Sequence, residues 1–386
     1  MEIRGFRPFI FSDNVKNFWS PPFDTISTEE ERELKKHEYN ITHITLPHGP
    51  GSIAESAQTF RSWVERGILT QLEEDSIILL RQKFTRNGEP KERFGIVALA
   101  RVFPEDGSIK PHEMTFEGPR KNREEVMRGL GLIPEPIFLI SPGNAFMDAI
   151  LASSRRARKV HAFKQPKDVE NTIYLIDDKK DIKNLSESLK KQVSIVADGH
   201  HRLAAIKEIA ATDHGGWDYA MAYIASSEDP ALYISGIHRI VKANITADSF
   251  LNSLSRFFNT KEVRAFDPER DLSIYLDGKF YSIEPRQDNL VELSEYIHDP
   301  GLFVKKIILG KIIGLDAKQI ETGIIYSHDI NYAINMVNDR RAGMVILMPD
   351  WDKKTFTEVV SAGHLLSQKS TYFYPKPPSG VAIYKP

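Results

Sequence analysis

Runs of apolar and β-branched residues predict antiparallel strands near both ends of the chain. Asn87-Gly88 lies between two such runs, at 77–84 and 94–103, and predicts a β-hairpin whose loop is longer than two residues. Asp277-Gly278 separates two further runs and predicts a second hairpin. Apolar residues at helical spacing also occur at 57–64. Both ends of the chain are therefore expected to be α+β.

The middle of the chain has a different pattern, in which short apolar runs alternate with helical stretches. Strands are predicted at 137–140, 172–176 and 193–197, and apolar residues at helical spacing begin at Leu203. This alternation is typical of an α/β arrangement. The pattern as a whole predicts a mixed α+β and α/β fold in three regions: an α+β N-terminal region at 1–105, a central α/β domain at 106–240, and an α+β C-terminal region at 241–386.

Composition narrows the classes of protein that these elements can form. A chain of 386 residues suits two or three domains. Lys and Arg number 51 against 53 Asp and Glu, so the net charge of −2 gives no reason to expect a nucleic-acid partner. The absence of cysteine excludes disulfides and thiolate chemistry. Since no apolar run approaches ~18 residues, no membrane partner is expected, and the chain is predicted to be soluble and cytoplasmic.

Five consecutive polar residues, Asp198-Gly199-His200-His201-Arg202, separate the strand at 193–197 from the helix that follows. Gly199 permits a tight turn, and the first N–H groups of the helix have no partner within it, so an anion can bind there. Asp198 offers an oxygen ligand for Mg²⁺, and Arg202 offers a bidentate fork to a phosphate. The histidines can donate hydrogen bonds or shuttle a proton. We interpret the turn as a phosphate and metal site.

Two other interpretations of the same turn remain open. Asp198 can simply cap the helix while the histidines bond nearby carbonyls, although a cap worth ~0.5–2 kcal/mol accounts for one of the five residues. Alternatively, Asp198, His200 and His201 can bind zinc, iron or manganese, since imidazole and carboxylate suit those metals. Adjacent histidines at a turn rarely both reach one ion.

The turn and the residues before it resemble the ParB/sulfiredoxin superfamily. The segment 109–115, then Arg120 and Arg123, then 135–137, precede the DGHHR turn in the order of that superfamily's domain. The resemblance therefore implies that 106–240 is a ParB/sulfiredoxin-like catalytic domain. The segments 20–24, 236–239 and 369–376 extend the resemblance, over essentially the whole length, to a large and mostly uncharacterised branch. The chain departs from that branch at Phe23 and Leu203, where tyrosine is usual.

The functional relatives of that branch that carry DGHHR are kinases for free L-serine. The resemblance thus implies a kinase that uses ATP or ADP with Mg²⁺ and gives O-phospho-L-serine, with Glu113 as general base. The predicted catalytic residues are Glu113, Asp198 and His200, with Asp198 also as metal ligand. Nucleotide is expected at Gly199, His200, His201, Arg202, Thr115 and Arg120. The amino-acid substrate is expected at His238, Arg239, Lys369, Ser370 and Thr371, where the last three can reach back over the site.

Two alternative functions stay open at this point. The shared domain also permits a ParB-like nuclease or a DNA-associated nucleotide switch, although the charge balance and the lack of a clear helix-turn-helix pattern disfavour both. The same turn can instead bind phosphate in a non-catalytic nucleotide or metabolite sensor. No P-loop, GxGxxG fingerprint or HExxH motif is present. The sequence leaves open the choice between ATP and ADP, the identity of the acceptor, and the oligomeric state.

Overall fold

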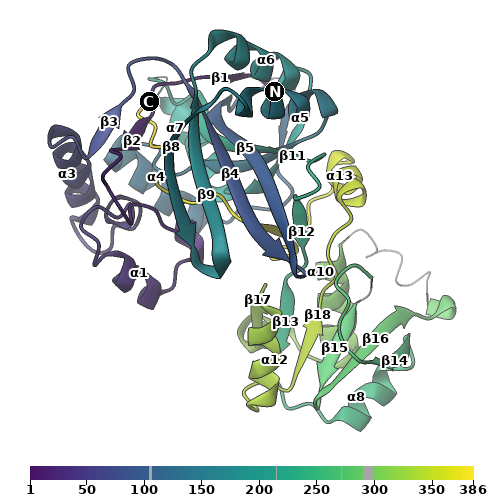
Figure 1. Ribbon diagram of the computed structural model, residues 1–386. Coiled ribbons are helices and arrows are strands. Elements are labelled where there is room, and N and C mark those ends of the chain that lie inside the picture. Colours follow the sequence, from purple (N-terminus) through teal and green to yellow (C-terminus); the bar gives the residue numbers. More distant parts are fainter. Residues whose placement is uncertain (104–106, 214, 271, 290–298) are drawn as a thin grey trace. The chain divides into compact units, whose positions relative to one another are not determined.

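The computed structural model describes residues 1–103, 107–213, 215–270, 272–289 and 299–386, and its contacts divide the chain into two compact units (Figure 1). The first unit comprises Met1–Leu232 together with Pro375–Pro386, and the second comprises Tyr233–Tyr374. The domain boundaries expected after residues 105 and 240 differ from those between the two units, which fall after Leu232 and after Tyr374. Strands from 1–105 and from 106–240 share one sheet, and the C-terminal segment returns to the first unit.

A large mixed sheet is the centre of the first unit. Among the described residues it has nine strands, in the order β6-β10-β7-β11-β5-β4-β9-β8, with β1 paired to β5. The pairs β6–β10 and β7–β11 are parallel and the others are antiparallel. The strands are β1 (Ile3–Arg4), β4 (Ile77–Arg86), β5 (Glu89–Arg101), β6 (Ile109–Lys110), β7 (Ile137–Ser141), β8 (Arg158–Gln165), β9 (Val169–Ile176), β10 (Ser194–Asp198) and β11 (Tyr219–Ser226), while β2 (Phe9–Phe11) and β3 (Leu69–Gln71) pair separately.

The hairpin between β4 and β5 has a two-residue loop, so the longer loop expected from the sequence is wrong. The pairing continues to Arg86 opposite Glu89, directly beside the turn. Asn87 and Gly88 both have positive φ, 52° and 78°, as a type I′ turn requires. The polar residues next to the turn are paired between the two strands. Because they interrupt the hydrophobic pattern, the sequence predicts strands that end too early.

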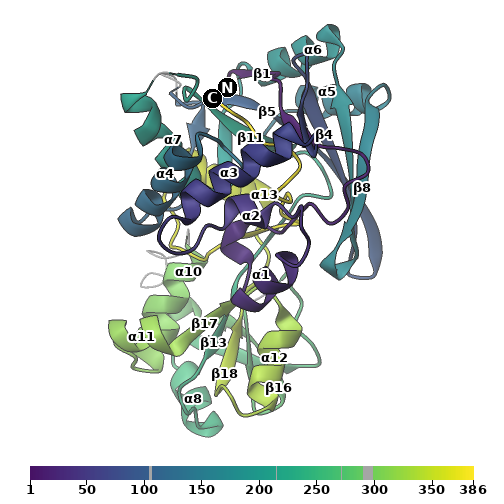
Figure 2. The ribbon, with the colours of Figure 1, turned by 90° about the vertical axis from the view of Figure 1, so that its left-hand side faces the viewer.

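Helices of the first unit pack on this sheet in two groups. In one group α3 (Ser52–Glu65), α4 (Glu117–Leu130) and α7 (His200–Thr212) lie side by side, with α4 touching both of the others (Figure 2). In the other, α5 (Asn144–Ser154) and α6 (Lys179–Leu189) pack together, α5 against β5 and β9 and α6 against β1. The short helices α1 (Thr28–Leu34) and α2 (Thr42–Thr45) precede α3. The packing of α4 on α7 brings the segment before α4 close to the polar turn.

The second unit contains its own sheet, in the order β14-β16-β15-β18-β13-β17 over the described residues. One core lies under α8, α11 and a π-helix at Val304–Ile312, and another lies under α12. The predicted hairpin at Asp277-Gly278 is confirmed. The elements are β12 (Tyr233–Ser235), β13 (His238–Val241), α8 (Ala247–Leu254), β14 (Phe258–Val263), β15 (Ser273–Leu276), β16 (Lys279–Pro285), α10 (Pro300–Phe303), α11 (Ala317–Gly323), β17 (Ile324–Ser327), α12 (Ile330–Asn338), β18 (Met344–Leu347), α13 (Lys353–Ser361) and β19 (Tyr372–Tyr374).

The predicted fold class is confirmed, because both units are mixtures of helices and mixed or antiparallel sheets. Across the residues that the structure describes, none of the helices combines the length and the apolar character that crossing a membrane requires.

Candidate active site

The polar turn lies between β10 and α7, as the sequence predicts. Gly199 is the N-cap residue of α7 and has a φ of 88°, a left-handed conformation that glycine adopts without strain. A Cβ at this position would stand 3.0 Å from Nε of Arg202. The turn therefore requires glycine both for its backbone angle and for the arginine that folds back over it.

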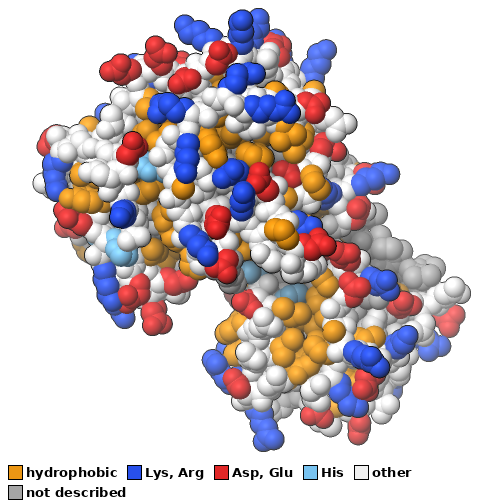
Figure 3. All heavy atoms as spheres, in the orientation of Figure 1, with side chains coloured by type: hydrophobic (Ala, Val, Ile, Leu, Met, Phe, Trp, Pro, Cys, Tyr) orange, Lys and Arg blue, Asp and Glu red, His pale blue; other side chains and the backbone are white. Residues whose placement is uncertain are grey.

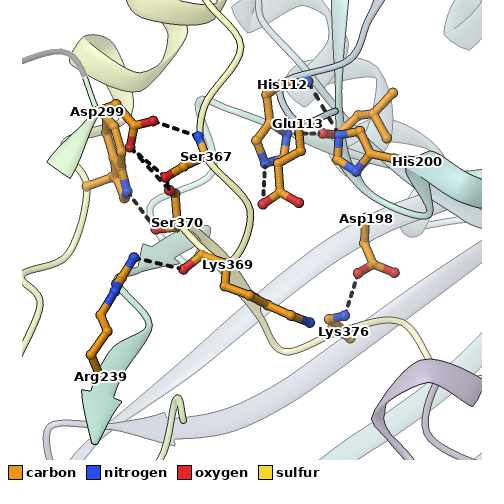
Figure 4. Close-up of polar contacts among 12 residues, drawn as sticks. His112, Glu113, Asp198, His200, Arg239, Asp299, Ser367, Lys369, Ser370 and Lys376 are labelled. Carbon is orange, nitrogen blue, oxygen red and sulfur yellow. Dashed lines mark hydrogen bonds and ion pairs between the residues drawn. The ribbon is translucent and has the colours of Figure 1, made fainter. Parts of the chain in front are cut away.

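Asp198 is held by two cations. Arg202 Nη2 donates to Oδ2 at 2.5 Å, and the Lys376 ammonium donates to Oδ1 (Figure 4 shows the second contact). Burial alone raises the pKa of Asp198, but the charges of Lys376 and Arg202 outweigh it and lower that pKa to about 2. The carboxylate is thus ionised at any physiological pH.

Arg202 connects the turn to the neighbouring strand. Its Nη1 donates to the carbonyl of Pro136, which precedes β7, while Nη2 holds Asp198. The side chain is only 7% exposed. The guanidinium that was expected to bind a phosphate therefore binds the protein at both of these nitrogens, and it orients the Asp198 carboxylate.

The two histidines of the turn both accept hydrogen bonds from the segment that leads from β6 to α4. His200 Nε2 accepts from the backbone N–H of His112 at 3.3 Å, and His201 Nε2 accepts from the N–H of Phe116 at 3.1 Å (Figure 4 shows the first). Each ring must then carry any hydrogen on Nδ1 when neutral. Burial, followed by the nearby His112 ring, holds the pKa of His200 well below its usual range. His200 is a neutral acceptor that fixes this segment.

Glu113 lies at this edge of the sheet because β6 and β10 are parallel neighbours, paired Ile109 to Ser194 and Lys110 to Ile195. Parallel strands in register bring the residues beyond their carboxyl ends together. The adjacent His112 is buried and its Nδ1 donates to the carbonyl of Val196, so its ring packs inward. Glu113 Oε1 lies 3.7 Å from His112 Nε2, and the Glu113 side chain remains 20% exposed.

Glu135 lies in the segment 135–137 that carries the resemblance, but no role in the site was predicted for it. It links two other segments to the site. Its Oε1 accepts from the backbone N–H of Phe23 at 3.2 Å and from the hydroxyl of Ser379. The residue is 4% exposed, and burial raises its pKa although Arg202 and other neighbours lower it. A glutamate inside the apolar run that leads into β7 was the available signal, because such a charge is buried only when it has partners.

Lys376 is the second residue that sequence reasoning missed. It comes from the C-terminal segment, and its ammonium also lies 3.8 Å from Oδ2 of Asp24. The motif at 369–376 was singled out, but attention went to Lys369, Ser370 and Thr371 at its start. The boundary between the two units falls after Tyr374, so the end of the same motif belongs to the first unit.

The other predicted site residues lie in two places. Thr115 is exposed between Glu113 and α4, and Arg120 of α4 pairs with Glu208 of α7. The remaining five belong to the second unit: His238, Arg239, Lys369, Ser370 and Thr371. There the guanidinium of Arg239 donates to the carbonyls of Ile237 and Lys369, and the hydroxyls of Ser367 and Ser370 meet Asp299 (Figure 4). A role for these five in binding the amino-acid substrate stays a prediction.

The carboxylates of the first unit can accommodate Mg²⁺ only together with a ligand. Within the described parts of the chain, no group of three or more His, Cys, Asp or Glu side chains is arranged around a metal position. Asp198 and Asp24 both lie against the ammonium of Lys376, a place where positive charge is already favoured. Mg²⁺ at phosphate sites often uses one or two carboxylates and takes its other ligands from phosphates and water. Asp198 and Asp24 fit that pattern.

His238 gives a prediction that concerns the second unit alone. Burial, then Arg239 and His328, lower the pKa of His238 from 6.5 to about 4, while Asp329 opposes this. Its Nδ1 accepts from the backbone N–H of Met348 at 3.1 Å, so folding favours the neutral ring. The unfolded chain binds this proton first as the pH falls. About 3 kcal/mol of stability should therefore be lost between pH 6.5 and 4.

The measurement is an NMR titration of the histidine ring signals, with a His238→Asn variant for assignment. We expect the His238 signal to shift with a midpoint near 4. The exposed His364 of the same unit serves as an internal comparison. A His238 midpoint near 6.5 would show that the ring is not held neutral by burial.

Comparison with known proteins gives one family and several distant structural neighbours. A free serine kinase in complex with AMP has a TM-score of 0.37 and 15% identity, over 72% of this chain and 86% of the other. SbnI with a C-terminal truncation, from Staphylococcus aureus, has a TM-score of 0.39 and 12% identity, over 72% and 82%. A conserved hypothetical protein from Pyrococcus furiosus has a TM-score of 0.36 and 15% identity, over 73% and 93%. A search of curated proteins finds no match.

Fold and site together define a mixed α+β protein of two units, whose larger sheet carries a polar strand-to-helix turn. The family described as "Protein of unknown function (DUF1015)" matches residues 3–307, and the chain belongs to that family.

Proposed function

We propose that this protein is a cytoplasmic kinase that transfers a phosphoryl group from ATP or ADP to the hydroxyl of free L-serine, giving O-phospho-L-serine. One observation carries the proposal. Glu113 and the Asp198–Arg202 turn follow two parallel neighbouring strands at one edge of the sheet, and both histidines of the turn bond the segment that carries Glu113. A carboxylate base and an anion-binding helix terminus therefore lie at the same edge.

In the proposed reaction the carboxylate of Glu113 accepts the proton of the serine hydroxyl as that oxygen attacks the terminal phosphorus of the nucleotide. The new bond joins the serine oxygen to phosphorus, and the bond from phosphorus to the bridging oxygen breaks. ATP leaves as ADP, or ADP leaves as AMP. Such transfers depend on positioning and on charge stabilisation more than on covalent chemistry with the protein.

The turn supplies the phosphate-binding part of this proposal. The first intrahelical hydrogen bond of α7 runs from the N–H of Leu203 to the carbonyl of Gly199 at 2.9 Å, so the N–H groups of His200 to Arg202 precede it at the N-terminus, where Gly199 allows a phosphate to approach the backbone. Asp198 and Asp24 would hold Mg²⁺, which neutralises phosphate charge when it is bound. Because His200 is a neutral acceptor, we assign it the role of positioning the segment of Glu113 rather than transferring a proton.

The proposal is tested by incubating the purified protein with Mg²⁺, a pool of amino acids and either ATP or ADP. Mass spectrometry should detect phosphoserine with at least one of the two nucleotides. Omitting Mg²⁺ is the control for the metal, and omitting serine from the pool is the control for the acceptor. A protein that forms no phosphorylated amino acid with either nucleotide does not have this function.

Two other functions are separated by their own measurements. Acidic and basic side chains are interspersed on the face in Figure 3, in keeping with the net charge of −2, so this face offers no extended basic patch for DNA. Salt-dependent DNA binding in a gel-shift titration would favour a nuclease or a DNA-associated switch. Tight nucleotide binding with no product, for every acceptor tried, would favour a non-catalytic sensor.

A further inference from the structure

A fully buried arginine holds the C-terminal segment of the first unit. Arg93 of β5 has no exposed surface, and its Nη2 donates to Oε1 of Gln82 at 2.6 Å and to the carbonyl of Pro375. Its guanidinium also faces two aromatic rings, at 5.4 Å from the ring centroid of Phe138 and 5.8 Å from that of Tyr223. Burying a guanidinium costs free energy, and hydrogen bonds from its N–H groups offset that cost.

Gln82 on the neighbouring strand β4 holds the next residue of the segment. Its Nε2 donates to the carbonyl of Lys376 at 3.3 Å and to Oδ1 of Asn171 at 3.0 Å. Asn171 is itself buried and donates to Gln165 and to the carbonyl of Val169. The carbonyls of Pro375 and Lys376 are therefore both fixed by side chains that belong to the interior of the sheet.

We call residues 375–386 the C-terminal strap. Beyond Lys376 it is fixed by the bond from Ser379 to Glu135 and by backbone pairing of Ser379 with Ser20, of Ile383 with Phe9 and of Tyr384 with Ile133. Most of its side chains are buried. These contacts fix the backbone of the strap, and with it the position of the Lys376 Cα.

Lys376 differs from Arg202, the other cation on Asp198. The Arg202 guanidinium donates to the Pro136 carbonyl through Nη1 and to the Asp198 carboxylate through Nη2. The Lys376 ammonium meets the carboxylates of Asp198 and Asp24, and its side chain is 13% exposed. An ammonium on a flexible stem can exchange one anionic partner for another, provided that its backbone is fixed at the right distance.

We propose that Lys376 binds a phosphate of the nucleotide at the Asp198 turn, and that Arg93 is the positioning residue that fixes the strap so that Lys376 reaches it. This inference rests on the proposed function as far as the nucleotide is concerned. The anchoring of the strap by Arg93 does not depend on it. The two parts are therefore tested by separate measurements.

Hydrogen exchange tests the anchoring. In Arg93→Lys the charge stays but the guanidinium Nη2 that reaches both Gln82 and Pro375 is lost, and exchange in 375–386 should become about 10-fold faster or more, with 137–141 unchanged. If that variant does not fold, Gln82→Glu replaces it, because its carboxylate still accepts from Arg93 but no longer donates to the Lys376 carbonyl. Unchanged exchange in the strap would overturn the positioning role.

Titration calorimetry with ADP and Mg²⁺ tests the phosphate contact. Lys376→Met should weaken ADP binding about 10- to 100-fold, the loss expected for one charged hydrogen bond, whereas Lys376→Arg should retain part of the affinity. Lys385→Met, at an exposed lysine of the same strap, is the matched control and should bind like the unchanged protein. Equal affinity of the Lys376→Met and unchanged proteins would overturn the contact while leaving the kinase proposal intact.

A double variant separates positioning from a general structural effect. If Arg93 acts through Lys376, Arg93→Lys should weaken ADP binding in the unchanged background but add little in the Lys376→Met background. Losses that simply add would contradict this coupling. If the unchanged protein binds no ADP, the proposed function and the phosphate contact both fail, and the exchange measurement still decides the anchoring.

Discussion

Glu113→Gln is expected to lower turnover by about 10²- to 10⁴-fold with little change in nucleotide affinity. The amide has the size of the carboxylate but cannot take the proton of the serine hydroxyl. The change should leave the local structure intact, because Glu113 is partly exposed and its contact with His112 is 3.7 Å long. The histidine bonds to the N–H groups of His112 and Phe116 involve backbone atoms that the substitution does not remove.

The measurement is a steady-state rate of phosphoserine formation, alongside a calorimetric affinity for ADP with each variant. Glu125→Gln provides the matched control, since Glu125 is an exposed glutamate on α4, the helix that follows the same segment. Its rate should equal that of the unchanged protein. A Glu113→Gln variant that keeps the full rate would mean that another group is the base.

Asp198→Asn is expected to lower the free energy of unfolding of the first unit by about 3–5 kcal/mol and to weaken nucleotide binding. The amide cannot neutralise the charges of Lys376 and Arg202, which would stay largely buried without their common carboxylate. Because both cations lose their common partner, the N-terminal end of α7 should become less ordered as well.

The pH dependence of stability follows from the same carboxylate. The pKa of Asp198 is about 2 in the folded state against an ordinary value of 3.8, so the folded state holds this proton less tightly than the unfolded chain does. Its contribution is full above pH ~4 and is lost as the pH falls toward 2, which amounts to about 2 kcal/mol. Asp198→Asn should remove that part of the acid sensitivity.

Urea unfolding followed by tryptophan fluorescence measures both effects. Three of the four tryptophans, Trp19, Trp63 and Trp217, belong to the first unit, so the signal reports mainly on it. Asp148→Asn, at an exposed aspartate of α5, is the control and should change the midpoint little. A midpoint for Asp198→Asn that equals that of the control would contradict the ion-pair network.

The parts of this structure that sequence could predict are those in which local pattern and local geometry agree. The strand, glycine turn and helix at 194–212 are confirmed because Gly199 is required where the apolar period changes from two to 3.6. Likewise, Asp277-Gly278 fixes its hairpin through two positive φ values. Asn87 and Gly88 also form a two-residue turn with two positive φ values. However, the polar residues at the ends of β4 and β5 interrupt the apolar pattern, so both strands were predicted too short and the loop too long.

What could not be predicted depends on contacts between residues far apart in the chain. Arg93 and Gln82 bind the carbonyls of Pro375 and Lys376, and the Lys376 ammonium binds Asp198, yet none of these positions stands at a characteristic spacing from another. The histidines were expected to meet a ligand, yet they accept from backbone donors supplied by the segment after β6. Their partners became visible only once β6 was paired with β10.

The central claim is that Glu113 and the Asp198 turn form one site for phosphoryl transfer to serine. It is tested most directly by ³¹P NMR of the protein with L-serine, Mg²⁺ and ATP or ADP, in parallel with Glu113→Gln. The phosphomonoester signal of O-phospho-L-serine should grow with the unchanged protein and be nearly absent from the variant over the same time. Nucleotide turnover that releases only inorganic phosphate, or equal phosphoserine signals from both proteins, would contradict it.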